Sequence, residues 1–428
     1  MKATDRSCRD IVFLILFIVH FGGIAAIIGT SINQKPSAED YQGFMPYNWT
    51  AGDISHFISY FELIGLLVIS SFVLSALYLF LLKTFTKPLI YLGIGFNIAV
   101  FFGMAVVSGI YGNYASAVIT TIFGVFIALF YFSIRSRIPF AIEMIRSVVE
   151  IIQNHPGTLV TSFCSILVQF FWVCLWTFAL FLSQRLSHSL VIVSSIFLLF
   201  SFYWVSEVIK NVVHVTVSGV VATVYFMGDY VPHNPTLGAL QRSLTTSFGS
   251  ICLGSLIVSF IKTLRSLVRM ARSEQNSLLL CLVDCLLSWI DALVMYFNHY
   301  AFCQVAIYGK TFIEASKSTW RLFKTAGLEA IINDNLVDGV LWVGVLLNGL
   351  VSGLIGIGLS FLIFGHLESV IVFFFLGFFI GFILMILAMQ VIDSGIACMM
   401  VCFAEDRNAL MRTNPTLYNE LCRTYNIY

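Results

Sequence analysis

Long, nearly uncharged hydrophobic runs recur along the whole chain, and they limit its fold more than any other feature. The runs at 11–29, 57–82, 89–110 and 159–182 hold about 20 residues each, enough for a helix to cross the ~30 Å hydrocarbon core of a bilayer. Charged residues make up only 11% of the chain, whereas soluble proteins carry roughly 25%. The runs are continuous and do not alternate as in a β-barrel. The sequence therefore predicts an all-α integral membrane protein.

We expect a bundle of about ten transmembrane helices in a single polytopic domain, residues 1–428. The expected spans are 11–30, 57–82, 88–110, 113–134, 157–182, 188–208, 211–227, 246–268, 336–363 and 370–402. The sixth and seventh belong to one apolar stretch, 187–227. This stretch can hold two spans with a tight turn, or one span and a re-entrant segment.

The segment between the eighth and ninth expected spans has a different pattern. Asp284, Ser288 and Asp291 recur at i, i+4 and i+7 and give a helix one polar stripe. Trp289 and Phe297 lie on another face, where we expect contact with the inner headgroup layer or with the underside of the bundle. We therefore expect cytosolic amphipathic helices at about 276–325.

The basic residues predict the orientation, because cytosolic loops carry the excess of Lys and Arg. With a cytosolic N-terminus, all of the 23 basic residues except Lys35, Arg185 and Arg242 fall on the inner side. Both termini are therefore expected in the cytosol. Asn48, in the Asn-Trp-Thr run of the first outer loop, matches the acceptor pattern for N-glycosylation.

No motif for catalysis stands out. The sequence lacks a Walker A loop and a His-Glu-x-x-His run, so neither nucleotide hydrolysis nor a metal or other cofactor is expected. The net charge of +1 gives no indication of nucleic-acid binding. The glycines at 93, 95, 353, 356 and 358 are typical of helix-packing faces.

Polar side chains inside the apolar runs are the candidates for function, because burying an ionisable group there costs at least ~2.5 kcal/mol. One group is dense: on a helix, Trp204, Glu207 and Asn211 share a face. Aromatic ring faces attract a quaternary ammonium group, and a carboxylate balances its charge. The resulting hypothesis is an organic-cation site that comprises Trp172, Tyr203, Trp204, Glu207, Asn211 and His214, with Asp393 in the last run as the next candidate.

In this hypothesis the rings cage the ammonium group, Glu207 supplies the counter-charge, and Asn211 and His214 bond a hydroxyl. A structural interpretation stays open for each residue. Polar groups in spans often bond neighbouring helices, and Glu207 is also spaced for an i,i+3 ion pair with Lys210.

The stretch 204–226 resembles the signature of the choline transporter-like family. Segments similar to other motifs of this family follow in the right order, at 137–141, 248–255, 298–312 and 404–418. The resemblance implies ten spans with cytosolic ends, a plasma-membrane location, and uptake of choline and related amino-alcohols without nucleotide hydrolysis. The first outer loop and the termini are short here, which resembles the compact branch of the family.

The sequence thus predicts a non-enzymatic transporter of choline or a related small organic cation, working among membrane lipids through a central aromatic-lined pathway. A lipid-handling or channel-like protein is the alternative, and it would have a hydrophobic, lipid-open groove. A membrane scaffold is the third reading, and it would have no central cavity.

Overall fold

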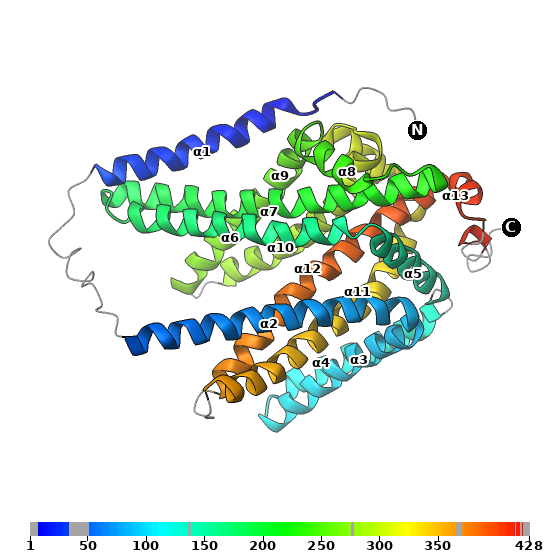
Figure 1. Cartoon of the computed structure of the whole chain (residues 1–428), viewed down its shortest axis with the longest axis horizontal. Coiled ribbons are helices and arrows are strands. Elements are labelled where there is room, and N and C mark those ends of the chain that lie inside the picture. The colour runs from blue at the N-terminus through cyan, green and yellow to red at the C-terminus, as the bar shows by residue number, and fades with distance from the viewer. Residues whose placement is uncertain are drawn as a thin grey trace. The chain divides into compact units, whose positions relative to one another are not determined.

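The computed structural model describes residues 7–33, 51–135, 138–274, 278–364, 370–415, 417–419 and 422. All of the regular secondary structure in these residues is helical (Figure 1). Ten helices in the described ranges are long and apolar enough to cross a membrane, so the predicted all-α multi-pass fold is confirmed. The chain divides into two compact units with five of these candidate spans in each.

The first unit comprises Met1–Asn48 and Gly157–Leu322. Its helices are α1 (Ile11–Ile32), α6 (Gly157–Ser183), α7 (His188–Met227), α8 (Pro235–Leu244), α9 (Phe248–Glu274), α10 (Leu278–Tyr308) and the start of α11 (Phe312–Phe364), with a 3-10 turn, η3 (Gly228–Tyr230), after α7. Helix α7 is the centre of this unit, because it packs against α6, α8, α9 and α10 (Figure 1). Helix α1 packs on α6 and α9.

Helix α7 corrects the prediction of a break between residues 208 and 211. It is one continuous helix of 40 residues, about 60 Å long and so about twice the ~30 Å apolar core of a bilayer. Its second half is apolar because protein covers it: Val213, Val217 and Val220 are buried, and α8 packs alongside. The hydrophobicity of this half therefore reports burial in protein.

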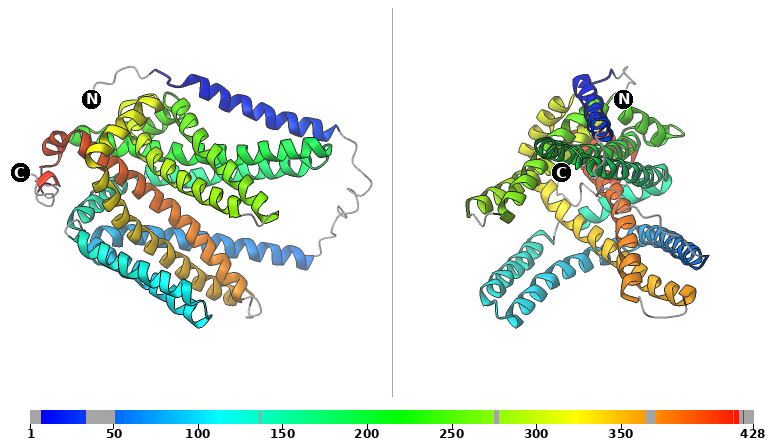
Figure 2. Two further views of the ribbon diagram at one scale, coloured as in Figure 1. Left: turned by 180° about the vertical axis from the view of Figure 1, so that it is seen from behind. Right: turned by 90° about the vertical axis from the view of Figure 1, so that its left-hand side faces the viewer.

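Helix α10 covers the first part of 276–325, where we predict cytosolic amphipathic helices, and its position relative to the membrane stays a prediction. It is 31 residues long and meets the length and apolarity of a span, and α11 begins four residues after it ends. The polar stripe faces α9, where Asp284 pairs with Arg269 and Arg272, each at 3.1 Å, and Asp291 pairs with Arg265 at 3.2 Å. Figure 2 shows α9 and α10 side by side. The acids are thus neutralised by a neighbouring helix.

The start of α1 is fixed by Asp10. Its carboxylate accepts hydrogen bonds from the Ser250 hydroxyl at 2.6 Å and from the backbone N–H of Phe312 at 2.8 Å. It therefore ties α1 to the first turns of α9 and α11. Gly249 permits this approach, because a Cβ there would overlap the carbonyl oxygens of Arg9 and Asp10.

The second unit comprises Trp49–Pro156 and Phe323–Tyr428. Its helices are α2 (Ala51–Thr84), α3 (Thr86–Ile110), α4 (Tyr114–Ile134), α5 (Ile138–Asn154), most of α11, α12 (Val370–Glu405) and α13 (Arg407–Thr413). Helices α3 and α4 form a hairpin, and α5 packs its apolar face on α2, α3 and α12.

Close helix packing in the second unit confirms most of the glycine prediction. A Cβ on Gly353 or Gly356 would collide with α12, and a Cβ on Gly93 would lie 2.8 Å from the backbone of Gly339. Gly358 and Gly95, in contrast, face open space. Small residues thus allow close approach of helices at three of the five positions.

Candidate functional site

Aromatic rings gather around Trp204 in the first unit. The Trp204 side chain is buried, and the ring centroids of Phe17, His20 and Phe200 lie 5.2, 4.8 and 5.5 Å from its own. Its indole N–H donates to the carbonyl of Cys252 on α9 at 3.1 Å. Trp204 is therefore a core residue whose N–H is already hydrogen-bonded, and it joins α1, α7 and α9.

A cavity of about 610 Å³ adjoins this aromatic cluster. Its aromatic lining is Phe17 and Phe21 of α1, Trp172 of α6 and Phe248 of α9. The remaining lining is mainly aliphatic and comes from α6, α7 and α8: Val160, Val168, Val205, Val208, Ile209, Val212, Val213, Leu240 and Leu244, together with Thr161, Cys164 and Ser165. No carboxylate is among these lining residues, so the cavity offers ring faces to a ligand without a counter-charge.

Trp172 brings a hydrogen-bond donor to this lining. Its side chain is only 5% exposed, and its ring lies edge-on to Phe21 with centroids 5.8 Å apart. Among the described residues its indole N–H has no hydrogen-bond acceptor. Because an unsatisfied buried N–H is costly, this donor is suited to bond a ligand oxygen.

The cavity begins at the end of the unit that carries α8 and the start of α9. Trp172 lies 15 residues into α6, which places it about 22 Å along the helix. Further along, the helices close, because a Cβ on Gly23 of α1 would lie 2.8 Å from the ring of Phe197 on α7. Val160, Cys164 and Val168 line the cavity while staying exposed, so the cavity is also open along α6.

The polar residues predicted on α7 contact α9. The hydroxyls of Tyr203 and Ser266 lie 2.8 Å apart, the Asn211 amide donates to the Ser255 hydroxyl at 2.9 Å, and Glu207 forms an ion pair with Lys262. Glu207 therefore pairs with a residue on another helix and not with Lys210. None of Tyr203, Glu207 and Asn211 lines the cavity.

His214 lies one turn further along α7, in contact with α10. Its Nε2 is 2.8 Å from the carbonyl oxygen of His299, and the two imidazole rings stack with centroids 4.2 Å apart. The Cys303 sulfur is 3.8 Å from the same nitrogen. Even so, the described residues contain no group of three or more side chains that could hold a metal ion.

Two predicted positions lie apart from this site. Asp393 is on α12, in the second unit, and is partly buried. Asn48 lies outside the described residues. Of the predicted binding residues, the structure therefore brings Trp172 to the cavity, places Trp204 behind it, and uses the polar members in contacts between helices.

Phe17, Phe21 and Phe248 were missed as site residues by sequence reasoning. Phe17 and Phe21 are spaced i,i+4 around His20, which itself contacts Trp204. That spacing places both rings on one face of α1. In a span so rich in phenylalanine and aliphatic residues, however, the same spacing is equally typical of lipid contact.

Comparison with known proteins finds one family model and several related proteins that match most of this chain. Residues 118–408 match the family model described as "Plasma-membrane choline transporter". A CTL-like protein from Dictyostelium discoideum is 34% identical, over 100% of this chain and 77% of the relative. Proteins named PNS1 from Debaryomyces hansenii and Mycosarcoma maydis are 30% and 31% identical, over 99% and 97% of this chain and 88% and 83% of their own lengths.

Proposed function

Because the chain belongs to the plasma-membrane choline transporter family, we propose that it carries choline or a related small organic cation across a membrane, without hydrolysing nucleotide. The substrate passes through the cavity of the first unit. The ring faces of Phe17, Phe21, Trp172 and Phe248 line that cavity and are suited to hold a quaternary ammonium group.

The observation that carries this proposal is the state of Trp172. Its ring faces the cavity, its side chain is almost fully buried, and its N–H has no acceptor among the described residues. A choline-like molecule offers a cation for the ring and a hydroxyl oxygen for the N–H. The aromatic lining and this N–H together match both chemical groups of the substrate.

The polar members of the sequence hypothesis have a supporting role in this proposal. Glu207, Asn211 and Tyr203 hold α7 against α9 through the contacts described above. Trp204 supports the ring of Phe17, which does line the cavity. The positive charge of the substrate is accordingly stabilised by aromatic rings and not by a buried carboxylate.

The proposed orientation places both termini in the cytosol and the protein in the plasma membrane. An even number of candidate spans is consistent with termini on one side. In this topology α8 is cytosolic, so Arg242 lies on the inner side and not on the outer side expected from the sequence. Arg269 and Arg272, at the end of α9, lie on the outer side and not on the inner side. The latter two pair with Asp284, which offsets their charge. The cavity then opens toward the cytosol.

The proposal is tested by uptake of labelled choline into liposomes that hold the purified protein. Ethanolamine and thiamine serve as competitors that separate quaternary from primary ammonium recognition. We expect saturable uptake of labelled choline. Unlabelled choline and thiamine should compete with it, and ethanolamine should inhibit it weakly. Uptake equal to that of empty liposomes would contradict the proposal.

Trp172→Ala is the sharpest variant for the site. Loss of one desolvated cation–π contact, about 2 kcal/mol, weakens choline binding by roughly 30-fold at 1.4 kcal/mol per decade. Trp172→Phe keeps a ring face and loses less. Phe171→Ala is the matched control, because the adjacent ring on α6 is 69% exposed. Equal effects of the substitutions at 171 and 172 would place the site elsewhere.

A second candidate function is favoured by the opening of the cavity along α6. Exposed Val160 and Val168 line a mainly aliphatic surface, which is compatible with an acyl chain and hence with lipid handling. Cation transport and lipid handling can be distinguished with the same liposomes. For this test the liposomes also contain a lipid whose fluorescent headgroup is quenched by an external reductant. Protein-dependent loss of the inner-leaflet signal without choline uptake would favour lipid handling.

A further inference from the structure

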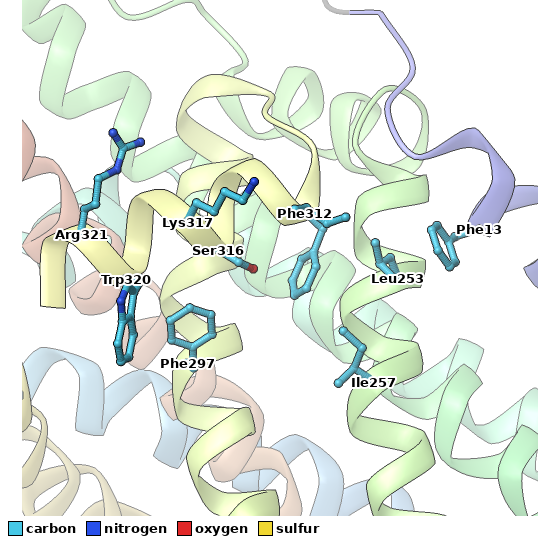
Figure 3. A pocket seen from close by; sticks show the side chains of 10 residues that line it. Phe13, Leu253, Ile257, Phe297, Phe312, Ser316, Lys317, Trp320 and Arg321 are labelled. Carbon is cyan, nitrogen blue, oxygen red and sulfur yellow. The ribbon is translucent and has the colours of Figure 1, made fainter.

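A second groove in the first unit lies outside the proposed transport site. It has a volume of about 890 Å³ and is lined by residues of α1, α9, α10 and the first turns of α11 (Figure 3). Its floor is apolar and includes Ile257 of α9 and Phe297 of α10. Lys317 and Arg321 of α11 lie at its edge, and Figure 3 shows the Arg321 side chain pointing away from Phe297 and Ile257. The groove is therefore mainly apolar, with two cations at one edge.

Among the residues that the structure describes, Lys317 and Arg321 have no acidic partner. They lie at i and i+4 on α11, so they share a face of the helix. No carboxylate in the described part of the chain forms an ion pair with Lys317 or Arg321, and the Arg321 guanidinium donates only a long hydrogen bond, of 3.5 Å, to the Ser318 hydroxyl there. Two adjacent unpaired cations favour an anionic ligand with several oxygens.

Other side chains of the groove fit the boundary between headgroups and hydrocarbon. Trp320 lies between the two cations in sequence and is 57% exposed, and tryptophan is enriched at that boundary. The hydroxyl oxygen of Ser316, which also lines the groove, is buried without a hydrogen-bond partner among the described residues. It can donate to an ester or phosphate oxygen.

The depth of the groove matches one leaflet. Lys317 is five residues into α11, and Ile257 is nine residues into α9, or about 14 Å along that helix. The two helix starts are joined by Asp10, which bonds Ser250 and Phe312. The apolar floor therefore extends from the charged end by about half of the ~30 Å hydrocarbon core.

We propose that this groove binds an anionic phospholipid of the surrounding leaflet, with its phosphate on Lys317 and Arg321 and an acyl chain against Ile257 and Phe297. Basic pockets beside apolar helices are a known mode of lipid headgroup recognition. The inference is independent of the proposed cargo, because none of these four residues lines the aromatic cavity.

The test uses the whole protein in nanodiscs and lipids with brominated acyl chains, which quench nearby tryptophan. Trp320 is the reporter, and Trp320→Phe identifies its share of the signal. Dibrominated phosphatidic acid is compared with dibrominated phosphatidylcholine. We expect a roughly 30-fold preference for the anionic lipid, equivalent to about 2 kcal/mol, and a loss of about fivefold for each of Lys317→Gln and Arg321→Gln.

Lys324→Gln is the matched control, since it removes the same charge from an exposed position on the same helix outside the groove. It should leave the preference unchanged, and an equal loss in this control would overturn the site. Ile257→Phe enlarges the side chain on the apolar floor while keeping both cations and adding no fluorescent tryptophan, and it should reduce quenching by the lipid. If glycerol 3-phosphate competes fully and Ile257→Phe has no effect, the ligand is a soluble phosphate and the lipid proposal fails.

Discussion

The ion pair between Glu207 on α7 and Lys262 on α9 lies within two candidate spans and is largely buried, with side chains 9% and 22% exposed. We predict that Glu207→Gln destabilises the protein, because Lys262 then stays charged without its partner. Lys262→Met, which strands the carboxylate, should do the same. The double variant Glu207→Gln/Lys262→Met removes both charges and should recover most of the loss.

The expected magnitude follows from this burial. Removing one partner of a buried pair costs about 3–5 kcal/mol, while replacing both is often close to neutral. Because Lys262 retains some exposure, we expect the lower end, about 3 kcal/mol for each single substitution. The coupling free energy is the cost of the double variant minus the costs of the two single variants, so it should be about −6 kcal/mol if the double variant is close to neutral.

The assay is thermal unfolding of the purified variants in detergent, followed by tryptophan fluorescence, with choline binding measured on the same samples. The exposed pair Lys83–Glu150, at 3.3 Å and with side chains 41% and 59% exposed, is the control. Breaking that pair should cost no more than about 1 kcal/mol. The two pairs together separate the effect of burial from that of charge.

Two results would refute the reasoning. If the double variant loses as much stability as the two single variants added together, the charges are not coupled and the pairing is incidental. If the double variant recovers stability but loses choline binding selectively, Glu207 contributes its charge to the substrate. That second outcome would restore the role that the sequence pattern predicted for this carboxylate.

Three further predictions follow from particular positions. Gly356→Ala should destabilise the contact of α11 with α12 by about 1–3 kcal/mol, because its Cβ would meet a carbonyl oxygen of α12. Gly358→Ala should be neutral, because this position faces open space. The melting temperatures of the two variants test both expectations. A cationic thiol reagent should modify Cys164, and choline should slow this modification. Cys174, which is exposed on the same helix but outside the cavity, should be modified at the same rate with and without choline. Mass spectrometry of single-cysteine variants measures both rates. Burial lowers the pKa of His155 below its ordinary 6.5. The unfolded chain therefore binds more protons, and stability should fall as pH drops below about 6.5. His155→Gln should flatten this pH dependence of the melting temperature, and an unchanged slope would show that His155 is not its source.

The membrane-spanning architecture could be predicted from the sequence, because a run of about 20 apolar residues has few alternatives to a spanning helix. The same holds for the close packing at Gly353 and Gly356. Small residues in a span allow backbones to approach each other, whichever helix supplies the partner.

Only part of the candidate cavity could be predicted. Trp172 was singled out because it and Trp176, four residues apart in one span, add aromatic rings to the polar cluster. Phe17, Phe21 and Phe248 were not, because phenylalanine in a span has the same pattern whether it faces lipid, protein or a cavity. The polar residues of α7 were correctly singled out as unusual, but their partners are far away in sequence.

Helices α7 and α10 show where the linear pattern ends and tertiary structure decides. Hydrophobicity reports that a segment avoids water, but not whether lipid or neighbouring helices cover it, so the 40 residues of α7 were divided into two spans. The carboxylates of α10 indicated a polar surface, yet the surface they meet is the arginine row of α9. Glu207 likewise had Lys210 within reach along the helix, and packing gave it Lys262 instead. The sequence by itself determined which segments leave water, because transfer free energy is a property of each residue. Only the tertiary structure decided their partners, because pairing depends on which helices lie side by side.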